Sequence, residues 1–189
     1  PTPAAARYRA TGDPNPPGVT PSLDPQAREL LERMESAGVP ASADCSVADA
    51  RRRPQRYPEF FVGDDDPEPV DSVREHAVEG PGGPLTVRVY EPGLDGPRPV
   101  LVYLHGGGWV LGNIEARDDF CRAWTNETGH VVVNVDYRLA PEDPFPAGLE
   151  DARAAMRWVQ RHADAIGGDA DRLVVGGDSA GGNLAAATA

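Results

Sequence analysis

The fold is decided by the stretch Gly177-Asp178-Ser179-Ala180-Gly181, which follows the apolar run Leu173-Val174-Val175. After it come a further glycine, an asparagine, a leucine and three alanines, a composition that favours a helix. A serine between glycines, at a turn from a buried strand into a helix, is the G-x-S-x-G pattern in the context it requires. Glycines suit this turn because the backbones approach closely there. We therefore expect a strand, a sharp turn at Ser179 and a helix.

The preceding residues alternate between strand and helix patterns. The nearly continuous apolar runs at 100–104 and 131–135 are typical of strands that are buried on both faces. Segments of helical length separate these strands from each other and from the last strand, at 115–128 and 147–166. This alternation predicts the α/β class, with a mostly parallel sheet that is flanked by helices.

Two earlier strands and a separate amino-terminal region are also predicted. Residues 73–78 and 85–90 alternate in polarity around the turn Pro81-Gly82-Gly83-Pro84, so we expect an antiparallel pair. Helix signals occur at 23–37 and 46–53, and an acidic linker follows at 63–69. The proline-rich start predicts a disordered tail. The expected domains are a tail at 1–22, cap helices and linker at 23–69, and a partial α/β core at 70–189.

The composition limits the class of protein. With 40% hydrophobic and 25% charged residues and a net charge of −12, the 189-residue chain is typical of soluble globular proteins and unsuited to nucleic acid. Its basic run, Arg51-Arg52-Arg53, is interpreted as a solvated helix face. The sequence has no apolar stretch long enough for a membrane span and no secretory pattern at its start. Two cysteines, Cys45 and Cys121, favour a reducing cytoplasm and give no metal cluster.

Two motifs predict a site at one edge of the sheet. The sequence His105-Gly106-Gly107-Gly108-Trp109 follows the strand at 100–104, and Ser179 follows the last strand. Because the carboxyl ends of parallel strands meet at one edge, we expect these motifs to be neighbours. A serine hydroxyl next to main-chain N–H groups suits acyl transfer, in which an oxyanion develops on the attacked carbonyl.

These motifs, together with residues 136–142, which read DYRLAPE, and 144–147, which read PFPA, resemble the hormone-sensitive-lipase-like carboxylesterases. This is the bacterial type IV group of α/β-hydrolases. The resemblance covers about residues 70–189 and, more weakly, the helix at 23–37. It implies that Ser179 is the nucleophile and that the amides of Gly106, Gly107 and Ala180 form the oxyanion hole. It also implies small-molecule ester substrates, no cofactor, no metal and a possible homodimer of the intact protein.

The sequence departs from the family pattern in two ways. Asp143 stands where the family often has histidine, at a position expected to be supporting. In this fold the catalytic acid and histidine follow the serine in the chain. The four histidines all precede Ser179 and are interpreted as structural: His76, His105, His130 and His162. We therefore expect a fragment that lacks the acid and the base, is itself inactive, and has an exposed, aggregation-prone edge strand.

The same motifs are compatible with other functions. A module that binds small molecules without turnover is the main alternative, and amide hydrolysis would use the same machinery. A phosphate cradle is disfavoured because the glycine run matches neither G-x-G-x-x-G nor a P-loop. Trp109, Phe145 and the region at 30–34 are expected to line an acyl pocket.

Overall fold

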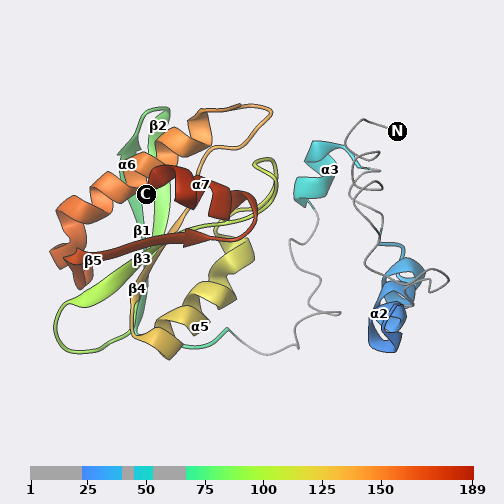
Figure 1. Cartoon of the computed structure of the whole chain (residues 1–189), viewed down its shortest axis with the longest axis horizontal. Coiled ribbons are helices and arrows are strands. Elements are labelled where there is room, and N and C mark those ends of the chain that lie inside the picture. The colour runs from blue at the N-terminus through green and yellow to red at the C-terminus, as the bar shows by residue number, and fades with distance from the viewer. Residues whose placement is uncertain (1–22, 40–44, 53–66) are drawn as a thin grey trace, which may run out of the picture. The chain divides into compact units, whose positions relative to one another are not determined.

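The computed structural model describes residues 23–39, 45–52 and 67–189. The chain divides into two compact units, residues 1–41 and 42–189. The tail predicted at 1–22 and most of the linker predicted at 63–69 lie outside the described residues. Figure 1 shows the chain with its elements labelled.

The first unit contains helix α2 (Pro25–Ser36). Asp24 caps it, since its carboxylate accepts a hydrogen bond of 2.8 Å from the Gln26 N–H. Pro25 occupies the first turn, where its missing N–H costs nothing. Gly38 follows the helix with a left-handed φ of 70°. The helix predicted at 23–37 is thus confirmed, shorter by a residue or two at each end.

The second unit is built on a mixed five-stranded sheet in the order β1-β2-β4-β3-β5. The strands are β1 (Ser72–Gly80), β2 (Gly83–Glu91), β3 (Arg98–Leu104), β4 (Val131–Val135) and β5 (Gly168–Gly177). β1 and β2 form the expected antiparallel hairpin, and β2 also pairs antiparallel with β4. β4, β3 and β5 are parallel. The sheet predicted from the sequence is confirmed, with its parallel part carrying the two motifs.

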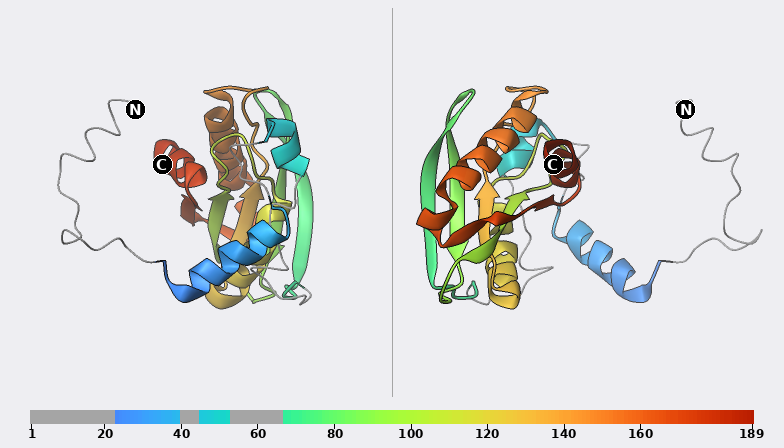
Figure 2. Two further views of the ribbon diagram at one scale, coloured as in Figure 1. Left: turned by 90° about the vertical axis from the view of Figure 1, so that its right-hand side faces the viewer. Right: turned by 60° about the vertical axis from the view of Figure 1, so that its left-hand side comes forward.

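Helices cover both faces of this sheet. On one face lie α6 (Ala147–His162) and α7 (Ala180–Thr188), and on the other lies α5 (Asp118–Thr128), preceded by the short 3-10 helix η2 (Glu115–Arg117) (Figure 2). Alternate residues of β3 enter different cores: Val100 and Val102 pack on the α6 side, whereas Leu101 packs on the α5 side. Burial on both faces explains why this strand is apolar throughout.

β5 is longer than the sequence indicated. The 3-10 helix η3 (Ala163–Ile166) extends α6 and ends at Gly167, whose φ of 69° is left-handed. The strand starts at the next residue, with no intervening loop. Its first half is polar and partly exposed, so the apolar pattern of the sequence predicted a strand only at Leu173 to Val175.

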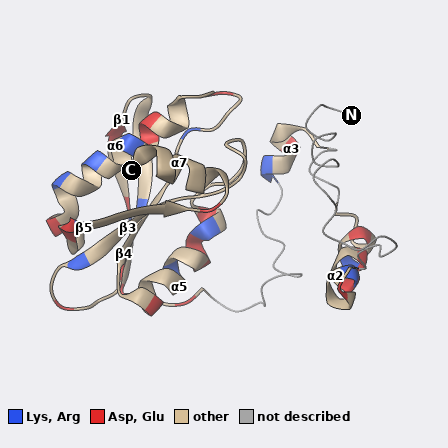
Figure 3. Ribbon diagram, in the orientation of Figure 1, with Lys and Arg blue, Asp and Glu red and all other residues tan. Residues whose placement is uncertain are grey.

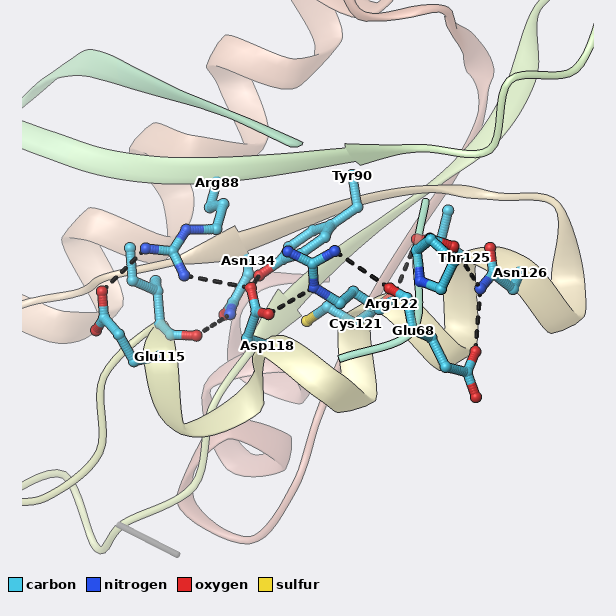
Figure 4. A network of polar contacts seen from close by, with 12 residues as sticks. Glu68, Arg88, Tyr90, Glu115, Asp118, Cys121, Arg122, Thr125, Asn126 and Asn134 are labelled. Carbon is cyan, nitrogen blue, oxygen red and sulfur yellow. Dashed lines mark hydrogen bonds and ion pairs between the residues drawn. The ribbon is translucent and has the colours of Figure 1, made fainter. Parts of the chain in front are cut away.

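A polar network anchors α5 to the sheet (Figure 4). The Asp118 carboxylate accepts hydrogen bonds from the Tyr90 hydroxyl at 2.7 Å and from Arg122 at 2.6 Å. Asn134, fully buried on β4, donates to the Ile114 carbonyl at 3.0 Å. These contacts fix η2 and α5, and therefore the Arg117 side chain that reaches the site.

The longest described helix is α6, with 16 residues. No helix in the described parts of the chain is both long and apolar enough to cross a membrane.

Because β5 lies at the edge of the described sheet, we expect it to be a site of self-association in this chain. Val174 on β5 is 52% exposed, and the strand has a partner on one side only among the described strands. We expect Val174→Lys to reduce concentration-dependent association in sedimentation velocity. The control is Leu94→Lys, because Leu94 is also 52% exposed but lies outside the strands. Equal effects of both substitutions would show that general surface polarity, not the strand edge, controls association.

Candidate active site

The two motifs meet where β3 and β5 end. Leu104 and Gly177 are register partners, so the chain leaves both strands side by side. Gly181, in the first turn of α7, lies against the end of β3. A Cβ atom at Gly181 would lie 1.9 Å from the Leu104 carbonyl oxygen, closer than any real contact. Glycine is therefore required here for α7 to start directly against the glycine loop.

The serine is held in a strained conformation at this junction. Ser179 is the residue before α7, is exposed, and has φ 50° and ψ −117°. Trp109, at the end of the glycine loop, has φ 60°. They are the two non-glycine residues with positive φ in the described parts of the chain, one in each motif. Such strain persists only where the surroundings impose it, and it is typical of functional sites.

Asp178 connects the motifs to each other. Its carboxylate accepts hydrogen bonds from the Gly106 N–H at 2.9 Å and the Tyr103 hydroxyl at 2.7 Å. Arg117 contacts both carboxylate oxygens, at 3.2 and 2.8 Å. Burial raises the pKa of Asp178, but the bonds from Arg117, Tyr103 and Gly106 outweigh it and hold the pKa well below its usual value. As expected for the residue beside Ser179, this carboxylate points away from the serine, into a structural clamp.

The N–H groups assigned to the oxyanion hole differ in whether they already donate a hydrogen bond. The Gly106 N–H is already donated to Asp178, so it is not available to an oxyanion. Gly107 and the exposed Gly108 follow it in the loop, and Ala180 starts α7. Within the described chain, no hydrogen bond acceptor is recorded for the N–H groups of Gly107, Gly108 and Ala180. The bond to Asp178 therefore argues against Gly106 as an oxyanion donor, whereas the assignment of Gly107 and Ala180 stays a prediction.

His105 is buried and supports the glycine loop through a hydrogen bond. It is 1% exposed, and its Nδ1 lies 2.8 Å from the Gly106 carbonyl oxygen. Because a carbonyl only accepts, Nδ1 carries the hydrogen. The ring stacks on Tyr137 at 4.4 Å, and the Tyr137 hydroxyl donates to the His105 carbonyl at 2.6 Å. Burial lowers the pKa of His105, which keeps the ring neutral. This agrees with the bracing role inferred from the sequence.

The other histidines lie in unrelated surroundings. His76 and His162 both contact the Trp158 ring, with ring centroids 5.2 and 5.1 Å away, and His162 stacks on it. His130 lies beside the Thr128 carbonyl at the start of β4. No hydrogen bond joins Ser179 to a histidine in the parts of the chain that the structure describes.

Helix α3 (Val47–Arg52) is bonded to the loops around the site through one arginine. Arg51 donates to the carbonyl oxygens of Val110 at 2.8 Å and Ala140 at 2.7 Å, and forms a bidentate pair with Glu142. The interpretation of the arginine run as a solvated face is thus wrong for Arg51, whose side chain is 29% exposed, and fits Arg52, at 71%. The sequence carried no signal for this contact, because the partners lie about 60 to 90 residues away.

An ion pair between Arg138 and the buried Asp151 carboxylate holds the turn between β4 and α6. Asp151, 1% exposed, accepts from the Arg138 N–H at 2.9 Å and from its guanidinium at 2.8 and 2.9 Å. Asp143 lies 3.6 Å from the same guanidinium. The 13-residue spacing of Arg138 and Asp151 joins the turn to the second turn of α6. Residues 136–142 thus support the site, as the sequence indicated.

A cavity of about 470 Å³ opens between this turn, the glycine loop and α7. Trp109 and Phe145, expected to line an acyl pocket, both line it. The part assigned to residues 30–34 stays a prediction. Among the described residues, no group of three histidine, cysteine or carboxylate side chains is placed to hold a metal ion.

Comparison with known proteins agrees with this geometry. The family model of the α/β-hydrolase fold matches residues 101–189. Esterase LipI of Mycobacterium tuberculosis is 40% identical over 179 residues, which is 89% of this chain and 54% of LipI. The carboxylesterase NlhH of the same species is 41% identical over 171 residues, 89% of this chain and 51% of NlhH. Residues 101–189 thus match the α/β-hydrolase fold, and the chain is similar to esterases over most of its length.

A solved structure supports the same assignment. The hyperthermophilic esterase from the archaeon Pyrobaculum calidifontis matches with a TM-score of 0.79 and 43% identity, over 89% of this chain and 53% of that one. The chain spans about half the length of the curated relatives it matches. Asp143, which stands where the resembled family often has histidine, pairs with Arg138, as suits a supporting position.

The Asp178 clamp predicts a pH-dependent stability difference. Because its folded-state pKa lies below the usual 3.8, Asp178 stabilises the fold above that value and loses this contribution as the pH falls below it. We expect Asp178→Asn to lower the free energy of unfolding by about 1–2 kcal/mol at pH 7, allowing for partial exposure. In urea titrations, the difference from wild type should shrink from pH 4 towards pH 3. A constant difference over this range would contradict the clamp.

The Arg51 contacts predict how α3 is held. Removing the guanidinium in Arg51→Ala eliminates the bonds to Val110, Ala140 and Glu142, so amide exchange in α3 should become about tenfold faster. Hydrogen–deuterium exchange of peptides that cover α3 measures this. Arg52→Ala is the matched control, since Arg52 pairs only with Asp49 of its own helix in the recorded contacts. If both variants exchange alike, intrinsic helix propensity controls α3.

Proposed function

We propose that the protein to which this chain belongs hydrolyses carboxylic esters through an acyl-enzyme on Ser179. The observation that carries the proposal is the junction itself. A strained, exposed serine starts α7 beside a glycine loop whose second and third amides have no recorded acceptor. The esterase names of its relatives support the same activity.

The proposed chemistry follows from these groups. The Ser179 hydroxyl attacks the ester carbonyl, and the carbonyl oxygen becomes an oxyanion. The amides of Gly107, Gly108 and Ala180 donate to it, in place of the set with Gly106. Loss of one such donor typically costs about 3–4 kcal/mol of transition-state stabilisation. The alcohol leaves, and water releases the acid by the reverse route.

The proposal requires a base and an acid that follow Ser179 in chain order, as in other α/β-hydrolases. The four histidines of the chain precede the serine, and His105 is held by Gly106 and Tyr137. Asp178 is held by Arg117 and Tyr103, so it does not orient a base. We therefore infer that the chain alone does not turn over esters.

Further features of the whole protein are part of the proposal. α3, bonded to the site through Arg51, is consistent with a cap formed by residues 23–69. A cytoplasmic location is supported by the small number of cysteines. The acidic charge argues against binding to nucleic acid, and a homodimer of the intact protein is part of the proposal.

Substitution of the serine tests the activity. In the full-length gene product, we expect Ser179→Ala to lower kcat for p-nitrophenyl acetate by about 10⁴-fold or more, because the nucleophile is removed. Ser72→Ala, on β1 and away from the site, is the control. A variant at Ser179 that keeps most of its rate would refute the nucleophile. Binding of ester without turnover by the wild type would favour the non-catalytic module, and faster cleavage of the matched anilide would favour an amidase.

A further inference from the structure

We propose that Arg51 of α3 is a positioning residue for the oxyanion donors. It acts through the main chain, because its guanidinium holds the carbonyl oxygens of Val110 and Ala140, where the glycine loop meets the turn between β4 and α6. The amides positioned in this way are those of Gly107 and Gly108. This inference rests on the proposed function, and it assigns part of the geometry of the site to a helix residue that lies 59 positions before Val110 in the chain.

The segment that presents these amides has an unusual backbone. Gly107, Gly108 and Trp109 have φ values of 133°, 62° and 60°, so φ is positive at three successive residues. The Gly107 carbonyl accepts from the N–H groups of Val110 at 3.1 Å and Leu111 at 2.8 Å, which closes a tight turn. Because Trp109 carries a side chain, it keeps this φ only where neighbouring groups impose it. The directions of the two glycine amides therefore depend on contacts from outside the loop.

Contacts from two other segments restrain the end of the loop. The Ala140 N–H donates to the Trp109 carbonyl at 2.8 Å. The Arg51 Nε donates to the Val110 carbonyl at 2.8 Å, and its Nη2 donates to the Ala140 carbonyl at 2.7 Å. One guanidinium thus bonds to the residue after Trp109 and to the residue that holds Trp109. It therefore restrains the junction at which the positive φ of Trp109 is imposed.

The planar shape of the guanidinium suits this junction. Glu142 accepts from Nη1 of Arg51 at 3.0 Å and from Nη2 at 2.9 Å, so its carboxylate fixes the plane of the fork. These hydrogen bonds from Arg51 lower the pKa of Glu142, which keeps the carboxylate ionised near neutral pH. The fork then presents its remaining donors to the two carbonyl oxygens. A lysine ammonium is a point charge on a flexible stem and does not reproduce this geometry.

Arg52 provides a matched control at the same end of α3, which is blue in Figure 3. Adjacent residues of a helix point about 100° apart, and Arg52 pairs with Asp49 of its own helix. A contact that only anchored α3 would change the exchange of α3 and the stability of the fold. A contact that positions the loop also changes the loop itself and the stabilisation of the transition state.

Kinetics of the full-length gene product test the role on p-nitrophenyl acetate. Arg51→Lys keeps the charge but removes the fork, so we expect kcat to fall about fivefold or more and KM to stay within about twofold. The reason is that misdirected amides stabilise the transition state less while the bound ester is little affected. Arg52→Lys should keep both constants within about twofold. Unchanged kcat in Arg51→Lys, a change in KM alone, or equal losses in both variants would overturn the proposal.

Hydrogen–deuterium exchange of the same proteins examines the loop without requiring turnover. In Arg51→Lys, peptides that cover residues 105–112 should exchange about fivefold faster, because the turn closed by the Gly107 carbonyl opens more often. Peptides of α6 report on global stability and should exchange as in the wild type. Thermal unfolding of each variant verifies that it is folded. If exchange increases in α3 but not in the loop, Arg51 only anchors its helix and the positioning role is refuted.

These measurements separate the positioning role from the esterase activity. If the intact protein proves not to hydrolyse esters through Ser179, faster exchange of the loop in Arg51→Lys would still show that Arg51 holds it in place. If Ser179 is the nucleophile and Arg51→Lys alters neither kcat nor loop exchange, the esterase assignment stands and the role of Arg51 fails.

Discussion

One carboxylate determines the geometry of the site. Asp178 lies on the elbow itself and accepts from β3 through Tyr103, from the glycine loop through Gly106 and from η2 through Arg117. Three segments are therefore fixed relative to Asp178, the residue beside Ser179. Because an ionised acceptor makes stronger hydrogen bonds than a neutral one, this clamp can hold the positive φ of the serine against its conformational cost. The position of the serine relative to the amides depends on it.

Much of the frame could be predicted from the sequence because the strands that form it are buried on both faces. The runs at 100–104 and 131–135 had to be apolar, and they are the strands that carry the glycine loop and the supporting turn. The polar first half of β5 gave no such pattern. The bond of the Gly106 amide to Asp178 could not be predicted, because a glycine run shows which amides lack side chains, but not which of them a distant carboxylate already occupies. Arg51 was misread because a helix of six residues reveals little about what lies beyond its side chains.

Charged groups that support the site are paired, and the surface of the cavity is largely apolar. Of the ionic contacts that support it, the pair of Arg117 and Asp178 lies outside the cavity lining, whereas Arg138, which pairs with buried Asp151, also lines the cavity. The surfaces that face the cavity are largely apolar, with α7 uncharged along its length. The charged groups in the cavity wall are partnered, because Arg138 bonds to Asp151 and lies 3.6 Å from Asp143.

Because Gly181 contacts the end of β3, a substitution at the start of α7 has a different consequence from one further along the helix. Backbone touches backbone at that point, and the distance depends on the absence of a side chain. Residues further along the same helix, such as Ala187, have no part in that contact. Substitutions further along α7 can therefore change the cavity wall without moving the turn at Ser179, so the two ends of this helix can vary independently.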